Sequence, residues 1–164
     1  MSTPAEEFER VITEYEKRLY NVALRLTGDP ETAFELTHET FIRAFRAWQR
    51  FRGDSSVYTW LYKIMINLNK DKIAREIRRR EYEVPLEPSP MEEGQIERVS
   101  PAPSPHEVAE THELRELLTE AVESLPPSYR ECLVLREVDG LSYEEIASVM
   151  GISVEAVRSR LARA

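Results

Sequence analysis

The chain has 164 residues, of which 41% are hydrophobic and 32% charged, and its formal net charge is −8. This length allows one ordinary domain or two small ones. A single cysteine excludes a disulfide framework within the chain. No run approaches the roughly 20 apolar residues of a membrane span, and the N-terminus lacks the basic and apolar segments of a signal peptide. The sequence therefore predicts a cytosolic protein. Only five glycines and the absence of long alternating β-branched runs predict an all-α fold.

Two helical patterns with a cap signal between them begin the chain. Apolar residues recur with helical spacing over residues 5–26, and Gly28 followed by Asp29-Pro30 predicts the end of one helix and the start of the next. The second helix, over residues 31–48, is expected to bury an apolar side that comprises Ala33, Leu36, Thr40, Phe41, Ala44, Phe45 and Trp48. Its opposite side is a polar face available to a partner and carries Glu35, His38, Glu39 and Arg43.

A third long helix is predicted from Val57 onward, after a loop at residues 51–56 that is rich in Gly, Asp and Ser. Its apolar stripe comprises Val57, Leu61, Ile64 and Leu68 and continues less regularly through Ile73 and Ile77. Aromatic residues gather at its start, namely Tyr58, Trp60 and Tyr62. Aromatic and cationic side chains together can hold unpaired bases, whereas the same aromatics could simply fill a three-helix core, and the sequence leaves both interpretations open. The helix ends in a basic run of Lys70, Lys72, Arg75, Arg78, Arg79 and Arg80.

The acidic residues are concentrated in the middle of the chain. Residues 85–127 carry a net charge of −8, whereas residues 1–84 carry +1 and residues 128–164 carry −1. Residues 85–105 are rich in proline and poor in large apolar side chains, so they cannot bury enough surface to offset the entropy of ordering. We therefore predict two small helical domains, at residues 1–84 and 106–164, joined by a flexible acidic Pro-rich linker at residues 85–105.

Two further helices are expected at the start of the second domain. Residues 107–125 have an amphipathic pattern that begins near a cap at Ser104 and ends at Pro126-Pro127, and residues 128–138 form the next helix.

The last 24 residues have the pattern of a helix-turn-helix. Ser142 and Glu145 form a capping box, and Ser153 can cap the final helix. The spacing of a helix-turn-helix is found at Ala147, Gly151 and Val157, because the close crossing of its helices needs a small residue at the first position and a left-handed turn at the second. The final helix also carries a group of cations, Arg158, Arg160 and Arg163, which suit guanine edges and phosphates. The sequence thus predicts DNA binding despite the acidic total.

Taken together, the chain resembles the extracytoplasmic-function (ECF) sigma factors, the smallest bacterial transcription initiation factors. The resemblance is carried by ELTHETFIRAFRAWQRFRGDSSVYTWLYKIMINLNKD at 35–71 and LPPSYRECLVLREVDGLSYEEIASVMGISVEAVRSRLARA at 125–164. It implies sigma region 2 in the first domain and region 4 in the second, with no enzymatic activity and no cofactor. The implied partners are core RNA polymerase (the clamp coiled coil of its β′ subunit and the flap of its β subunit), promoter DNA and an anti-sigma factor.

The resemblance also assigns roles to individual residues. Docking on the clamp coiled coil falls to Glu35, Leu36, His38, Glu39 and Thr40. Single-stranded DNA of the minus-ten element, including a flipped base, is assigned to Phe51, Arg52, Gly53, Asp54, Ser55, Lys63, Asn67, Lys70 and Arg75. The minus-thirty-five duplex is assigned to Arg158, Ser159, Arg160, Ala162 and Arg163. In this family the linker runs through the RNA exit channel of the polymerase, where acidic residues such as Glu92 can mimic RNA.

The chain reaches Ala164 inside the recognition helix, where relatives usually continue for several turns, which indicates either a shortened chain or a weaker upstream contact. Three other functions are less well supported. A helix-turn-helix repressor acting alone would leave the polar face at residues 35–43 unexplained. An enzyme would need a phosphate loop, metal ligands or a nucleophile with a base, and the three histidines are scattered. A scaffold that binds polymerase without DNA would not need the terminal arginines.

Overall fold

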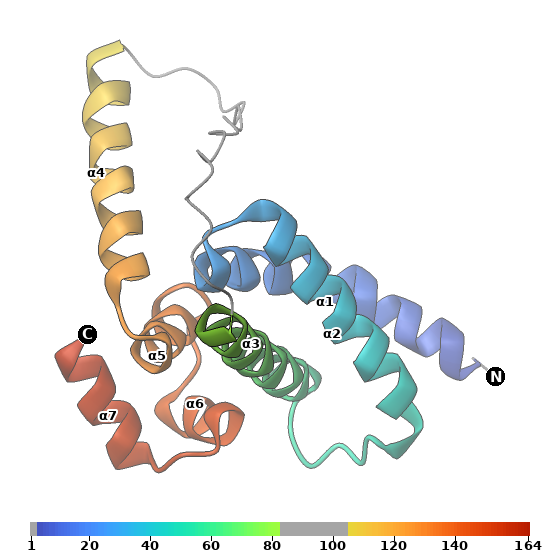
Figure 1. Cartoon of the computed structure of the whole chain (residues 1–164). Coiled ribbons are helices and arrows are strands. Elements are labelled where there is room, and N and C mark those ends of the chain that lie inside the picture. Colours follow the sequence, from blue (N-terminus) through green and yellow to red (C-terminus); the bar gives the residue numbers. More distant parts are fainter. Residues whose placement is uncertain (1–2, 83–104) are drawn as a thin grey trace.

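The computed structural model describes residues 3–82 and 105–164, and every regular element in these ranges is a helix (Figure 1), which confirms the predicted all-α fold. The elements are α1 (Pro4–Thr27), α2 (Pro30–Ala47), the 3₁₀ turn η1 (Trp48–Arg50), α3 (Val57–Tyr82), α4 (Pro105–Ser124), α5 (Pro127–Glu137), α6 (Tyr143–Met150) and α7 (Val154–Arg163). The predicted cap at Ser104 and the predicted linker, apart from Pro105, lie outside the described residues. None of the described helices has the length and apolar character needed to cross a membrane.

Local signals in the sequence account for the boundary between α1 and α2. Gly28 adopts φ 71°, in the left-handed region, and its N–H donates to the Leu24 carbonyl at 2.9 Å. The Asp29 carboxylate then accepts from the backbone N–H of Thr32 at 2.8 Å, which caps α2. This cap leaves α1 and α2 packed side by side, with α3 against them (Figure 1).

The core of the N-terminal unit (α1–α3) is built around large side chains that are fully buried, namely Phe8, Leu19, Leu61, Tyr62 and Met65. Two predicted core residues are exposed instead, which corrects the sequence interpretation: Phe45 is 52% exposed and Ile77 is 54% exposed. Phe45 packs its ring beside Phe8, at a centroid distance of 5.3 Å, on the outer edge of the core. Ile77 belongs to the last turns of α3, where almost every side chain is exposed.

In the C-terminal unit (α4–α7), helices α5, α6 and α7 pack together, and their buried residues belong to one core cluster with those of α1–α3. Arg130 fixes the corner between α4 and α5, because its guanidinium donates to the carbonyls of Val122 at 3.0 Å, Leu125 at 3.2 Å and Glu123. Helix α4 projects from the rest of the molecule (Figure 1), which leaves its leucines largely exposed.

Candidate functional site

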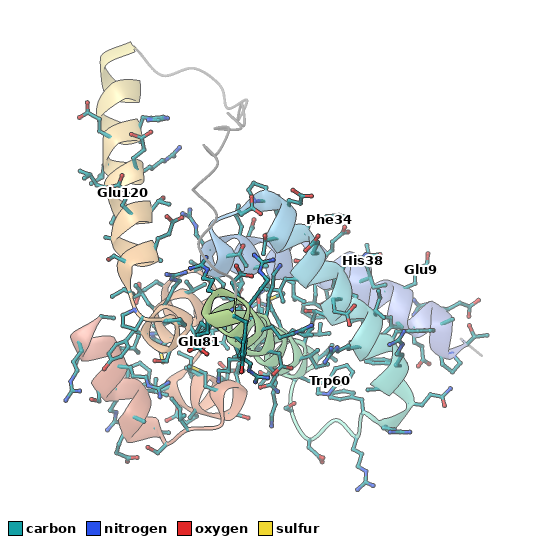
Figure 2. All side chains as sticks on the ribbon, viewed as in Figure 1. Glu9, Phe34, His38, Trp60, Glu81 and Glu120 are labelled. Carbon is teal, nitrogen blue, oxygen red and sulfur yellow. The ribbon has the colours of Figure 1, made fainter. Side chains whose placement is uncertain are left out.

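An apolar groove of about 770 Å³ lies between α1 and α2. Its lining is mostly aromatic and aliphatic, with charged residues at its edges, and comprises Ala5, Phe8, Glu9, Ile12, Glu16, Lys17, Tyr20, Phe34, Thr37, His38, Phe41, Ile42, Phe45 and Arg46. Phe34 is 64% exposed and stacks on His38, with ring centroids 6.0 Å apart. Figure 2 shows Phe34 and His38 on α2 and Glu9 on α1 along this outer side of the N-terminal unit. Such a groove can receive the apolar face of a helix.

The predicted docking residues on α2 divide into exposed and buried members. Glu35 and His38 are exposed, and Glu39 is half-buried. Leu36 and Thr40 point into the core, where the Thr40 hydroxyl donates to the Leu36 carbonyl at 2.7 Å. These two residues therefore cannot contact a partner directly, and they shape the surface only by holding α2 against its neighbours.

Ion pairs hold the polar face of α2 in place. Glu35 lies 3.4 Å from Lys72 of α3, and Glu39 lies 3.0 Å from Arg43 one turn along α2. All four side chains are substantially exposed, so each pair contributes little to stability.

The predicted loop at residues 51–56 is anchored by aromatic stacking. Phe51 lies nearly parallel to Trp48, at 5.7 Å and 10° between planes, and its centroid is 4.8 Å from that of Trp60. Arg52, Gly53, Asp54 and Ser55 follow, the first three exposed, and Gly53 adopts φ 73°. The aromatic cluster thus fixes one end of the loop, while the backbone after it stays open to solvent, with Trp60 beside the loop in Figure 2.

The three aromatics at the start of α3 have different environments. Tyr62 is fully buried, so the core interpretation holds for it, and burial raises the pKa of its hydroxyl. Tyr58 and Trp60 are half-buried. Tyr58 donates its hydroxyl proton to Glu145 of α6, whereas Trp60 stays next to the loop.

Cations line the solvent side of α3. Lys63 and Asn67 are exposed one turn apart, and Arg75 is exposed two turns further, with its Nε donating to the Asp71 carbonyl at 3.3 Å. Lys70 is engaged elsewhere, because its ammonium lies 4.0 Å from the buried carboxylate of Glu131 on α5. Lys63, Asn67 and Arg75 therefore remain available to a nucleic acid strand, while Lys70 faces the C-terminal unit.

The predicted helix-turn-helix is formed by α6 and α7. Ser142 and Glu145 make both hydrogen bonds of the capping box, at 3.1 Å and 2.8 Å. Gly151 adopts φ 67° at the turn, and the Ser153 hydroxyl accepts from the Ala156 N–H at 3.1 Å. Val157 is fully buried against the unit's core, so the opposite face of α7 is presented to solvent.

The exposed face of α7 carries four of the five predicted reading residues, namely Arg158, Ser159, Ala162 and Arg163. Arg160 differs, because it is half-buried. Burial raises the pKa of Glu131 on α5, and the positive charge of Arg160 partly opposes that rise. Tyr143 adds a feature that sequence reasoning missed: its ring centroid lies 5.1 Å from the guanidinium of Arg136 and 6.0 Å from that of Arg158. An aromatic ring at this range attracts a guanidinium and favours a defined position for Arg158.

Comparisons with known proteins agree with these features. Residues 11–80 match the family model described as Sigma-70 region 2, and residues 115–164 match Sigma-70, region 4. The chain is 37% identical to the RNA polymerase sigma-H factor of Pseudomonas aeruginosa over 158 residues, which cover 96% of this chain and 81% of that protein. It belongs to the sigma-70 family of RNA polymerase sigma factors, in its ECF group.

Other relatives extend this result. The chain is 36% identical over 160 residues to the ECF RNA polymerase sigma-E factors of Salmonella typhimurium and Escherichia coli, which cover 96% of this chain and 82% of those proteins. The fold is shared with the sigma factor RpoE in its complex with the anti-sigma factor NepR from Bartonella quintana, at a TM-score of 0.73, 20% identity and coverage of 96% and 91% of the two chains. It is also shared with CnrH in complex with the cytosolic domain of CnrY, at a TM-score of 0.64, 22% identity and coverage of 95% and 80%.

As a member of this family, the chain is a non-enzymatic factor that directs promoter-specific transcription initiation by RNA polymerase.

Proposed function

We propose that the two units divide promoter recognition between them, as residues 1–84 and 106–164, with residues 85–105 as the connection. The N-terminal unit docks on core polymerase and opens the minus-ten element, and the C-terminal unit reads the minus-thirty-five duplex. The observation that carries this division is the placement of exposed cations on α3 and on α7, in the two segments that match sigma regions 2 and 4.

Docking on the clamp coiled coil of the β′ subunit uses the groove between α1 and α2. Phe34, His38 and Phe45 supply the apolar and aromatic anchors, and Glu35 and Glu39 supply charge beside them. A coiled-coil helix presents an apolar stripe of the width that a groove between two helices accepts. Sequence reasoning placed Phe45 on the buried side of α2 because of its helical spacing, and it gave Phe34 no role.

The loop and the solvent side of α3 take the nontemplate strand of the minus-ten element. Unstacking a base costs a few kcal/mol, which contacts to a pocket offset. The open backbone at residues 52–55 accommodates the base, while Lys63 and Asn67 supply hydrogen bonds and Arg75 pairs with a phosphate.

Arg158, Ser159 and Arg163 read the minus-thirty-five duplex from the major groove, with Ala162 beside them on the same face of α7. Arg160 supports α5 more than it reads bases.

The flap of the β subunit packs on α4, whose exposed leucines at i, i+3 and i+4 form an apolar stripe of Leu114, Leu117 and Leu118. The protein works in the cytoplasm, and an anti-sigma factor restrains it; the structural neighbour RpoE is described in complex with the anti-sigma factor NepR.

Fluorescence of 2-aminopurine at a minus-ten position of the nontemplate strand tests the assignment on α3. With core polymerase, the wild-type chain should raise the signal as the base unstacks, and N67A and K63A should lower that rise. R10A, which changes an exposed cation on α1 outside all the proposed contacts, should behave as wild type. Full opening by both α3 variants would contradict the assignment.

A further inference from the structure

Two arginines share one aromatic ring at the helix-turn-helix. The guanidinium of Arg136, near the end of α5, lies 5.1 Å from the centroid of the Tyr143 ring on α6. The guanidinium of Arg158 on α7 lies 6.0 Å from the same centroid. The ring therefore connects the two helices of the helix-turn-helix with α5, and Figure 1 shows these three helices grouped together.

The Tyr143 ring is attached to a fixed part of the fold. Tyr143 is the first residue of α6, directly after the Ser142 cap, and its side chain is half-buried against the core. Arg136 is anchored as well, because its Nη1 donates to the Leu141 carbonyl at 2.8 Å. Leu141 is 1% exposed, and its N–H donates to the Leu135 carbonyl at 3.1 Å. The ring and one of its two cations are thus held by residues of the core.

Arg158 has an exposed side chain on a fixed backbone. The preceding residue, Val157, is fully buried, which holds the backbone of Arg158 on the outer side of α7. Among the side chains that the structure describes, no carboxylate forms an ion pair with the Arg158 guanidinium. An aromatic face attracts a guanidinium and stacks against its plane. The Tyr143 ring therefore supplies an attraction that limits where this guanidinium lies.

The position of a guanidinium matters because arginine distinguishes bases through two donors at once. Reading guanine requires two N–H groups to meet O6 and N7 in the plane of the base. A guanidinium that moves freely can donate instead to phosphate oxygens, which every sequence offers. Its contribution to affinity then persists while its discrimination falls. A side chain that restrains Arg158 should therefore affect sequence preference more than total binding.

We propose that Tyr143 is a positioning residue: its ring holds the Arg158 guanidinium and thereby sets the base preference at one position of the minus-thirty-five element. Arg136 ties the same ring to α5. The effect on base preference rests on the proposed function of α7, whereas the restraint on Arg158 in the free chain does not. The Tyr143 hydroxyl has no part in this restraint, so phenylalanine should replace tyrosine and leucine should not.

Binding of minus-thirty-five duplexes to holoenzyme measures the effect on base preference. Each base pair of the element is substituted in turn, and the position whose preference disappears in R158A is the one that Arg158 reads. At that position, Y143L should lower the ratio of matched to substituted affinity by about two- to five-fold, the size of an exposed cation–π contact. Y143F, the matched control, should keep the wild-type ratio. Adding Y143L to R158A should lower the ratio no further.

The mobility of the Arg158 side chain in the full-length chain without polymerase tests the restraint separately. The nitrogen-15 order parameter of its Nε–Hε group should fall in Y143L and keep the wild-type value in Y143F. If Y143L loses helicity, phenylalanines with one to three ring fluorines are incorporated in place of Tyr143. Fluorine withdraws electron density from the ring face at nearly constant shape, so the affinity ratio and the order parameter should both fall stepwise.

An equal loss of affinity for matched and substituted duplexes in Y143L would overturn the proposal, because Tyr143 would then make only contacts that are independent of sequence. The same fall of the ratio in Y143F, or a further fall when Y143L is added to R158A, would overturn it too. So would an Arg158 order parameter that neither leucine nor the fluorinated rings change. Full discrimination in R158A would instead contradict the proposed function, and the order parameters would still decide whether Tyr143 restrains Arg158.

Discussion

Replacing Phe34 with alanine should weaken polymerase binding and leave the fold intact. Phe34 is 64% exposed. A phenylalanine presents roughly 200 Å² of surface, so about 130 Å² is free to be buried on docking, which corresponds to about 3 kcal/mol at ~25 cal/mol per Å². Alanine retains part of that surface and docking buries it incompletely, so the expected loss is about 2 kcal/mol, or roughly 30-fold in Kd.

The assay is a titration of labelled chain with core polymerase by fluorescence anisotropy, alongside thermal unfolding of the free chain. F34A should change Tm little, because truncating an exposed side chain shifts stability by about 0.5 kcal/mol or less. Y82A is the matched control, since Tyr82 is an aromatic residue at 87% exposure on the end of α3, outside the groove. Wild-type affinity in F34A, or an equal loss in Y82A, would refute the assignment of the groove.

Further predictions concern α7, the turn before it and two carboxylates. R158A in holoenzyme should weaken binding of the minus-thirty-five duplex by about 1–3 kcal/mol and relax its sequence preference, measured against matched and scrambled duplexes; an unchanged preference would exclude Arg158 as a reader. G151A should lower the free energy of unfolding in urea by about 1 kcal/mol, because Gly151 has φ +67°, a left-handed conformation that strains alanine even where the space around it is open. An unchanged free energy of unfolding would contradict this. Burial raises the pKa of Glu131, so the protonated Glu131 carboxyl stabilises the fold at acid pH, and this stabilisation is lost as pH rises through that pKa. E131Q should therefore unfold at a higher temperature than wild type near neutral pH, and the two melting temperatures should converge in acid. The hydrogen bond from Tyr58 lowers the pKa of Glu145, so its contribution is present above the ordinary carboxyl range and is lost as pH falls; E145Q should be less stable than wild type near neutral pH, and the difference should shrink in acid. Melting curves across pH that show the same sign for both variants would contradict this account.

The helix boundaries could be predicted from the sequence because their signals are local. Each capping residue forms its hydrogen bond with a backbone group within four residues along the chain, and the structure shows this at Gly28, Asp29, Ser142, Gly151 and Ser153. The helix-turn-helix was predictable for the same reason.

The exposure of individual residues was less predictable, because an amphipathic pattern gives the apolar side of a helix but not how far its neighbours cover it. Phe45 lies on the apolar side of α2 and borders an open groove. Leu36 and Thr40 are buried, as the helical pattern predicts, although the resemblance assigns both to docking. Tyr58 was assigned either to the core or to a base; it packs against the core and also donates its hydroxyl proton to Glu145 of the other unit.

Contacts between the units could not be read from the sequence at all. Arg18 and Asp139 are 121 positions apart, and nothing in the local pattern of either residue indicates its partner. Such pairs depend on how two folded units meet, which is set by the whole surface of each.

Transcription in vitro is the experiment that shows whether this chain selects promoters for RNA polymerase. Core polymerase would be given a library of promoter-like DNA with and without the chain, and transcript starts would be mapped. We expect new starts that depend on the chain and lie downstream of two motifs at a constant spacing. Specific retention of duplex DNA by the chain alone, with no polymerase binding and no new starts, would contradict it.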